Sequence, residues 1–281
     1  MKIQYYGTSA GAGIPEMFCS CRVCEHARRE RGKNIRTRSQ AAIDDCLSID
    51  FSVDAFMHTL YNGLDMRKLR HVLVTHSHHD HFMGADAISR PLWEGEPMRF
   101  YGSEKSIVGF KRGIDASEQA YREGRRIRTS NYVPEAHYLE MFTPTEINGY
   151  RVIPLRAHHA ENVEAMNFII GKDGKNVLWA HDTGLFHPET KEYLKDCGIR
   201  FDFVSLDCTL ARGKQITKSH MDLEWCAETA AFLREIGCID ESTIVVLSHI
   251  GHLVERTHEE LEQEAAEFGF EVAWDGRVFE F

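Results

Sequence analysis

Short apolar runs recur along the whole chain, and stretches with helical periodicity lie between them. Two of the runs, Val72–Val74 and Ile244–Leu247, are continuous and rich in β-branched residues, which is typical of strands buried on both faces. The pattern predicts strands at Ile3–Tyr6, Ala41–Ile49, His71–Thr75, Met98–Tyr101, Tyr138–Phe142, Arg151–Leu155, Ala165–Ile170, Asn176–Ala180, Phe203–Leu206, Thr243–Leu247, Glu271–Trp274 and Arg277–Phe281. It predicts helices at Arg22–Glu30, Ala55–Tyr61, Ser103–Gly124, Pro188–Asp196, Asp222–Ile236 and Thr257–Phe268.

Strands and helices alternate throughout, which favours a layered α/β fold of mixed sheets covered by helices. Asn148-Gly149 and Asp275-Gly276 lie between strand-like runs and predict two β-hairpins. Thr257 followed by Glu260 predicts a capping box at the start of the last helix. There is no linker rich in Pro, Gly and Ser and no short repeat, so we expect residues 1–281 to form a single domain.

The composition is that of an ordinary globular protein. The 281 residues are 43% hydrophobic and 27% charged, which argues against disorder and against a membrane bundle. The net charge of -10 makes nucleic acid an unexpected partner, because its phosphates attract basic proteins. The start of the chain, Met1–Gly7, lacks the basic segment and apolar core of a signal peptide. We therefore expect a cytoplasmic protein without membrane contact.

The strongest chemical motif is a histidine cluster directly after the predicted strand at His71–Thr75. The sequence of this cluster is His76-Ser77-His78-His79-Asp80-His81. In an extended segment, residues i and i+2 point to the same side, so His76 and His78 can bind one ion. A turn into a helix then directs Asp80 and His81 to a neighbouring position, where a second ion can bind. Imidazole and carboxylate ligands favour transition metals such as zinc or manganese over calcium.

Three later strands also end in potential ligands. His158 and His159 follow one strand, His181 and Asp182 follow another, and His249 follows a third. A carboxylate bridges two cations through its two oxygens, so Asp182 is our candidate for the bridging ligand. His159 would complete the first metal site and His249 the second.

Cysteine usage indicates a separate metal site. Cys19, Cys21 and Cys24 lie within six residues, whereas the other cysteines are single and fit small buried apolar positions. Structural zinc takes four sulfur or nitrogen ligands in a tetrahedron, so the three thiolates need one further ligand.

Together these motifs resemble the metallo-β-lactamase superfamily of hydrolases. The resemblance covers nearly the whole chain and is strongest to the phosphodiesterase branch typified by the phosphoribosyl cyclic phosphodiesterase of the carbon–phosphorus lyase pathway. The closer match rests on Gly7–Gly11, on Cys19–Cys24, and on His249-Ile250-Gly251-His252. The resemblance implies a four-layer αβ/βα sandwich, with the metal ions in the cleft between two sheet edges.

The resemblance also implies a ligand assignment. The first metal takes His76, His78 and His159, with His158 as a rival for His159. The second metal takes Asp80, His81 and His249, and Asp182 bridges the two. His252 completes a structural zinc site with the cysteine loop, at about residues 17–26, and so ties that loop to the segment that carries His249.

A histidine ahead of a predicted helix is the candidate general acid. In phosphodiesterase-like members, a histidine at the position of His220 lies beside the metals and donates a proton to the leaving oxygen. An imidazole titrates near neutral pH, which suits this role. We count His220 and the metal ligand Asp80 as the catalytic residues. Asp207 ends a strand and is a candidate for orienting a ligand histidine, and His181 has no assigned role.

The expected activity is hydrolysis of a small cyclic or linear phosphodiester by a hydroxide bound to two divalent ions, zinc or manganese. Three alternatives stay open: a tRNA-processing endoribonuclease, a thioester hydrolase, and a metal-binding protein without turnover. Processing enzymes carry a protruding basic arm, whereas the segment Lys111–Arg128 predicts a helix with a basic end. Relatives that form dimers make a homodimer a further expectation.

Overall fold

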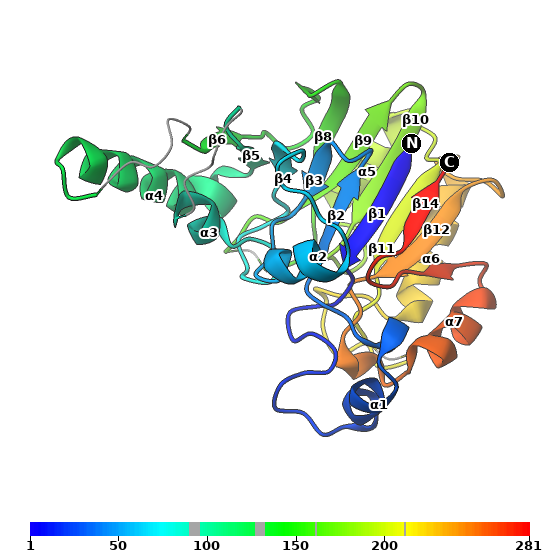
Figure 1. Ribbon diagram of the computed structural model, residues 1–281. Coiled ribbons are helices and arrows are strands. Elements are labelled where there is room, and N and C mark those ends of the chain that lie inside the picture. Colours follow the sequence, from blue (N-terminus) through cyan, green and yellow to red (C-terminus); the bar gives the residue numbers. More distant parts are fainter. Residues whose placement is uncertain (90–95, 127–132, 161, 211) are drawn as a thin grey trace.

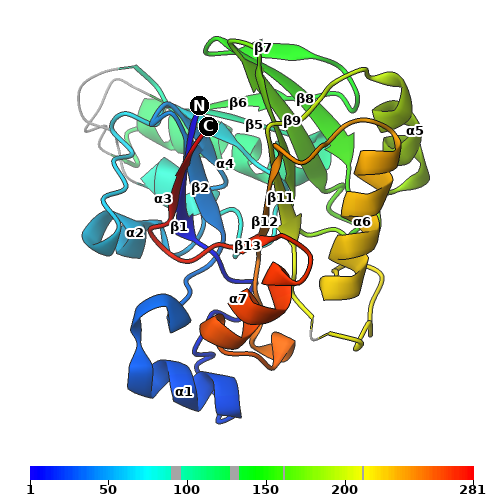
Figure 2. The same cartoon turned by 90° about the vertical axis from the view of Figure 1, so that its right-hand side faces the viewer.

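The computed structural model describes residues 1–89, 96–126, 133–160, 162–210 and 212–281. Two mixed sheets face each other, and helices cover their outer faces, so that four layers result (Figures 1 and 2). This arrangement confirms the predicted αβ/βα sandwich. Among the described residues, no helix has the length and apolarity needed to cross a bilayer. Residues 127 and 128, at the basic end of the segment Lys111–Arg128 that was also expected to be helical, lie outside the described residues.

Each sheet is built from seven strands in the described part of the chain. The first has the order β14 (Val278–Glu280), β1 (Lys2–Gly7), β2 (Gln40–Ile43), β3 (Leu47–Ile49), β4 (His71–Leu73), β5 (Arg99–Gly102) and β6 (Glu135–Tyr138). The second has the order β13 (Glu271–Val272), β12 (Ile244–Ser248), β11 (Phe203–Asp207), β10 (Lys175–Ala180), β9 (Met166–Lys172), β8 (Tyr150–Arg156) and β7 (Thr145–Ile147).

The outer layers divide between the two sheets. The first sheet is covered by α2 (Ala55–Tyr61), α3 (Gly84–Ser89) and α4 (Glu104–Arg122). The second is covered by α5 (Pro188–Asp196), α6 (Leu223–Glu235) and α7 (His258–Ala266). The helix α1 (Arg22–Glu30) lies beside α7 at the end of the sandwich, next to the short turn η1 (Gly32–Asn34), and a second short turn, η2 (His252–Val254), precedes α7 (Figure 2).

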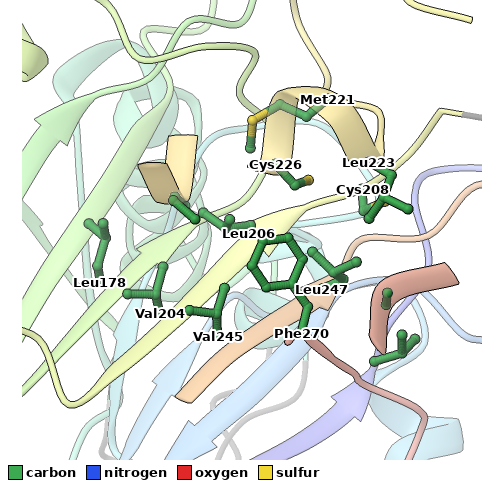
Figure 3. Packing of buried hydrophobic residues seen from close by; sticks show 14 of the residues in the cluster. Leu178, Val204, Leu206, Cys208, Met221, Leu223, Cys226, Val245, Leu247 and Phe270 are labelled. Carbon is green, nitrogen blue, oxygen red and sulfur yellow. The ribbon is translucent and has the colours of Figure 1, made fainter. Parts of the chain in front are cut away.

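Buried apolar side chains fill the spaces between these layers. Between the sheets, Tyr5 stacks on Trp179 and meets the edge of Phe279. On the outer face of the second sheet, Leu206 and Leu247 pack under the helices, as Figure 3 shows. Val72 and Val74 face the α3–α4 layer while Leu73 faces the other sheet, which explains the continuous apolar run. Because these strands are packed on both faces, they hold the loops at their ends in defined positions.

Several elements differ from the prediction. Ala41–Ile49 is a hairpin rather than one strand, because Asp44 and Asp45 adopt positive φ and turn the chain between β2 and β3. Asn148-Gly149 forms the predicted hairpin, with positive φ at both residues, and β7, which the sequence did not predict, is its first strand. The capping box at Thr257 is also confirmed. The short helix α3 was not predicted, and Tyr138–Phe142 is a strand only at its first residue.

The hairpin predicted at Asp275-Gly276 is wrong. β13 pairs with β12 in the second sheet, whereas β14 pairs with β1 in the first. The segment between them crosses from one sheet to the other. The Asp275 carboxylate stabilises this crossing, because it accepts hydrogen bonds from the backbone and hydroxyl groups of Thr8 and Thr37.

Candidate metal centre

The site lies where strands of both sheets end. In the first sheet, Asp50 follows β3 and the histidine motif follows the parallel strand β4. In the second sheet, Asp182 follows β10 and His249 follows β12, and the strand between them, β11, ends at Asp207. Ligands of α/β folds collect at the carboxyl ends of such strands. The fold therefore brings together side chains that lie far apart in the sequence.

The first group of potential ligands is His76, His78 and His159. Nε2 of His76 lies 2.9 Å from Nδ1 of His78, and Nε2 of His159 lies 3.3 Å from the same atom. Three ring nitrogens at this spacing converge on one point, as they would around a single ion. Burial lowers the pKa of His76 well below its usual value and also lowers that of His159, which keeps both rings neutral and able to bind metal.

The second group is Asp80, His81, Asp182 and His249. Asp182 also approaches the first group: its Oδ1 lies 3.7 Å from Nε2 of His159, whereas its Oδ2 lies 2.5 Å from Nε2 of His81. Nε2 of His249 lies 3.0 Å from the same Oδ2. A carboxylate whose two oxygens face two ligand clusters has the geometry of a bridging ligand.

The orientation of the imidazoles shows that these residues fit a cation. Nδ1 of His81 lies 2.6 Å from a carboxylate oxygen of Asp50, and Nδ1 of His249 lies 3.2 Å from one of Asp207. These acceptors place the hydrogen on Nδ1, so Nε2 presents its lone pair to Asp182. Oδ2 of Asp182 is buried and has no hydrogen-bond partner. Converging lone pairs repel one another unless a positive charge lies between them.

The electrostatics of the second group lead to the same conclusion. Burial disfavours charge on His249, yet the Asp182 and Asp207 carboxylates raise its pKa to about 10. Burial acts in the same way on His81, and Asp182 and Asp50 raise its pKa well above the usual value. The attraction between the buried carboxylates and a charged imidazole thus exceeds the cost of burying that charge, and the centre favours positive charge. Two divalent ions would supply that charge.

Asp50 was not predicted from the sequence. Its buried carboxylate contacts Nδ1 of His81 and accepts hydrogen bonds from the backbone N–H and the hydroxyl of Thr75. The available signal was its place directly after a strand, as for His249. Carboxylates that hold metal-binding histidines in this way fix the ring orientation and raise its basicity.

Three residues of the site have left-handed backbone conformations. Asp50, Asp182 and His249 have φ of 65°, 49° and 56°. Asp50 and His249 directly follow their strands and Asp182 is the second residue after β10, and at each position the left-handed residue turns the chain at the strand end. Non-glycine residues rarely adopt this conformation, and strain of this kind concentrates at functional sites.

His220 lies next to the two metal groups. Its Nδ1 is 3.0 Å from Oδ2 of Asp207 and 3.6 Å from Oδ1 of Asp182. Burial disfavours its charged form, but Asp207 and Asp182 together raise the pKa of His220. Asp207 contacts Nδ1 of both His220 and His249, in line with the predicted role of orienting a ligand histidine.

The remaining histidines of the motifs are placed differently. His158 directs Nδ1 to the carbonyl of Leu185 and belongs to neither ligand group, so the geometry favours His159 over His158. His181 is buried, and its Nε2 lies 2.7 Å from the hydroxyl oxygen of Ser205, which in turn contacts the hydroxyl of Tyr5. His181 is thus part of the packing behind the centre.

The N-terminal loop lies against the same centre. A Cβ at Gly11 would lie 3.1 Å from Oδ2 of Asp80, so any larger residue there would press on the Asp80 carboxylate. On the other side, a cavity of about 440 Å³ opens next to His159. Lys105, Lys218 and Arg156 contribute basic groups to its lining.

The structure also brings the cysteine loop to His252. The Sγ atoms of Cys19, Cys21 and Cys24 and a ring nitrogen of His252 all lie within 4.8 Å of one another. Burial opposes a charge on Cys21, but hydrogen bonds from the Cys24 backbone and from His252 lower its pKa to about 6. A thiolate beside two further thiols and an imidazole has the ligand chemistry of structural zinc. Zinc binding at this site stays a prediction.

Comparison with known families identifies the fold family. A model described as "Beta-lactamase superfamily domain" matches residues 47–250. The chain belongs to the beta-lactamase superfamily. This superfamily consists of metal-dependent hydrolases, and its match includes the histidine motif, Asp182 and His249.

Solved structures of several other proteins share the whole fold. A diphosphatase from the PhnP family superposes with a TM-score of 0.72 at 21% identity, covering 100% of this chain and 98% of that chain. Zn²⁺-bound PqqB from Methylobacterium extorquens gives 0.71 at 19% identity, covering 100% of both chains. The short form of human tRNase Z gives 0.62 at 15% identity, covering 100% of this chain and 99% of that one. The predicted metallo-β-lactamase fold, shared with the PhnP family, is confirmed.

Two curated relatives match over part of their length. The octanoyltransferase of Porphyromonas gingivalis is 26% identical over 258 residues, covering 89% of this chain and 46% of that protein. Coenzyme PQQ synthesis protein B of Methylobacterium radiotolerans is 32% identical over 116 residues, covering 37% of this chain and 37% of that protein. The chain spans less than half the length of these curated relatives.

Proposed function

We propose that the protein is a phosphodiesterase that uses two divalent metal ions, zinc or manganese. The observation that supports this best is the position of His220 beside the bridging candidate Asp182, with its ring held by Asp207. A phosphodiester needs both a hydroxide nucleophile and a proton for the leaving oxygen. The metal groups and His220 offer these two functions side by side. The likeness to the fold of a PhnP-family diphosphatase agrees with phosphorus–oxygen chemistry.

The first metal would be held by His76, His78 and His159, and the second by Asp80, His81 and His249, with Asp182 shared between them. When bound, the two ions acidify a water and neutralise charge on the phosphoryl oxygens. The protein's own contribution is orientation. Asp50 and Asp207 hold the imidazole rings of His81 and His249. Asp182 contacts both ligand clusters and so would fix their position relative to each other.

His220 would supply the proton. Because Nδ1 of His220 is directed to Asp207, the opposite ring nitrogen, Nε2, is left for the substrate. The raised pKa of His220, caused chiefly by Asp207 against the effect of burial, favours the imidazolium that a general acid requires. The side chain is 22% exposed, so the ring is open to solvent. Loss of this proton donor would slow only reactions whose leaving group needs protonation.

A second candidate is hydrolysis of a thioester or another carboxyl ester. It is favoured by the relative named octanoyltransferase, whose similarity extends over 89% of this chain. The same metal ligands would serve this reaction. A thiolate leaves without protonation, so thioester hydrolysis would not depend on His220.

The decisive experiment compares leaving groups. Metal-loaded wild-type protein and His220→Asn are assayed with bis-p-nitrophenyl phosphate, a 2′,3′-cyclic nucleotide and octanoyl-coenzyme A, with zinc or manganese added. The cyclic nucleotide has a poor alkoxide leaving group, so we expect its kcat to fall about 10²- to 10⁴-fold in the variant. Turnover of bis-p-nitrophenyl phosphate should fall much less, because p-nitrophenolate leaves unprotonated.

Metal content measured on the same samples is the control, since both proteins must hold equal amounts of metal. Equal losses on both phosphodiesters would contradict the role of His220. Turnover of the thioester alone would overturn the phosphodiesterase proposal in favour of the second candidate. Absence of all turnover in fully metallated protein would favour a metal-binding protein without catalysis.

A further inference from the structure

Two cysteines outside both metal sites share one hydrogen-bond acceptor. Cys197 follows the last turn of α5, and Cys238 lies in the turn after α6. Sγ of Cys197 lies 3.3 Å from the carbonyl oxygen of Leu194, and Sγ of Cys238 lies 3.5 Å from the same oxygen. The common acceptor places the two thiols side by side on the outer layer of the second sheet.

The two thiols differ in exposure and in acidity. Cys197 is partly exposed, whereas Cys238 is 3% exposed and belongs to the apolar cluster under the helices. A hydrogen bond from the Cys238 thiol lowers the pKa of Cys197 to about 6, and the same interaction raises the pKa of Cys238. An accessible thiolate next to a protonated partner is the arrangement found in thiols that react with peroxides.

We propose that Cys197 and Cys238 form a reversible disulfide when the protein meets a hydroperoxide. The Cys197 thiolate attacks the peroxide oxygen, the O–O bond breaks, and the departing alkoxide or hydroxide takes up a proton. Sulfur of Cys238 then attacks the resulting sulfenic acid, and the S–O bond breaks as the S–S bond forms. The thiol proton leaves with hydroxide as water. The two thiols are oxidised by two electrons, and the peroxide is reduced by the same two.

The disulfide would enclose a functional part of the chain. Residues 197–238 include β11, α6, Asp207 and His220. A covalent link that closes a loop of this length restricts the unfolded chain, and we expect the melting temperature to rise by roughly 5–10 °C. Dithiothreitol would reverse the change. Oxidation therefore alters the stability of the segment that carries the proposed general acid without touching a metal ligand.

A second pair of neighbouring cysteines serves as a control for Cys197 and Cys238. Cys208 and Cys226 also contact each other, and Sγ of Cys226 donates to the carbonyl of Asp207. Both are fully buried in the apolar cluster, at 0% exposure (Figure 3). Burial raises the pKa of Cys226 well above the usual value and keeps peroxide away from it. The native protein should therefore keep this pair reduced under conditions that link Cys197 to Cys238.

Peptide mapping tests the proposal. Zinc-loaded full-length protein is treated with hydrogen peroxide, its remaining thiols are alkylated, and it is digested with trypsin without reduction. We expect peptides 196–200 and 235–256 to appear joined and lighter by two hydrogens, and peptides 201–212 and 219–234 to appear separately and alkylated. In Cys238→Ser, dimedone should label Cys197 as a sulfenic acid.

Thermal unfolding provides the second readout. Treated wild type should melt above treated Cys197→Ser, and the difference should vanish in dithiothreitol. The comparison of equally treated proteins removes any effect of peroxide on the zinc-binding cysteines. Recovery of Cys197 as an unlinked peptide in treated wild type, or equal melting temperatures of the treated wild type and the treated Cys197→Ser variant, would overturn the proposal.

Discussion

Nδ1 of His81 lies 2.6 Å from Oδ2 of Asp50, and both side chains are buried at the junction of the two sheets. The other oxygen of Asp50 accepts hydrogen bonds from the backbone and hydroxyl of Thr75, which precedes the histidine motif. One carboxylate thus fixes both the start of the metal-binding loop and the ring of its last histidine. Because Nδ1 is occupied, His81 presents Nε2 to Asp182.

Replacing Asp50 should therefore weaken metal binding without removing a ligand. In Asp50→Asn we expect the affinity of the site that contains His81 to fall about 10- to 100-fold, because an amide does not hold the imidazole as firmly. Competition with a chelator, followed by metal analysis, measures this affinity. Asp65→Asn is a suitable control, since Asp65 pairs with the exposed Arg67 far from the strand ends of the site. A folded Asp50→Asn protein with wild-type affinity would contradict the assigned role.

The cysteine loop makes a separate prediction about zinc. If Cys19, Cys21, Cys24 and His252 bind one ion, Cys19→Ala should lose one zinc per chain, because structural sites need all four ligands. The candidate metal centre should keep its metal when metal is supplied in excess. Metal analysis after dialysis measures the loss. Cys46→Ala is the control, because Cys46 is also partly exposed, donates to the carbonyl of Asp44 and belongs to none of the ligand groups found among the described residues. Unchanged zinc in Cys19→Ala would rule out the site.

The sequence pointed to these ligand groups because their members lie at or shortly after the ends of apolar strands. His249 directly follows β12, Asp182 lies two residues after β10, and His76 lies three residues after β4. The order of elements likewise followed from alternating apolar runs. The sequence favoured His159 over its rival His158, and the geometry agrees, because a shift of one residue changes the direction of the side chain.

Roles that depend on distant partners could not be predicted from local patterns. Asp50 looks like any strand-end carboxylate until β3 and β4 pair and bring it to His81. Asp275 looked like a hairpin residue, yet its partners Thr8 and Thr37 lie at the other end of the chain. In both cases the role of the carboxylate depends on which groups donate hydrogen bonds to it. The pairing of strands determines which donors lie next to it.

A buried histidine outside the metal centre couples stability to pH. His58 on α2 is 0% exposed, with Nδ1 2.7 Å from Oε1 of Gln40 and Nε2 2.8 Å from the hydroxyl of Thr37. Burial lowers its pKa from the usual 6.5 to about 4. A proton would place a charge on a ring that stacks on Tyr6, a member of a buried apolar cluster. The folded protein therefore keeps this ring neutral where the unfolded chain would already bind a proton.

The direction in which pH changes the free energy of unfolding follows from the different pKa values of His58 in the folded and the unfolded chain. Above pH 6.5 neither state binds the proton, and His58 adds no pH dependence. As the pH falls from 6.5 towards 4, only the unfolded chain becomes protonated, so the free energy of unfolding should decrease by up to about 3 kcal/mol. Below pH 4 both states bind the proton, and the contribution levels off.

Urea unfolding at a series of pH values checks this prediction in wild type and His58→Gln. The variant does not titrate at this position, so its stability should decline less steeply between pH 6.5 and 4. Acid also releases metals from histidine ligands, and this loss affects both proteins equally. The difference between the two curves therefore isolates His58. Parallel curves over the whole range would mean that the buried ring does not resist protonation.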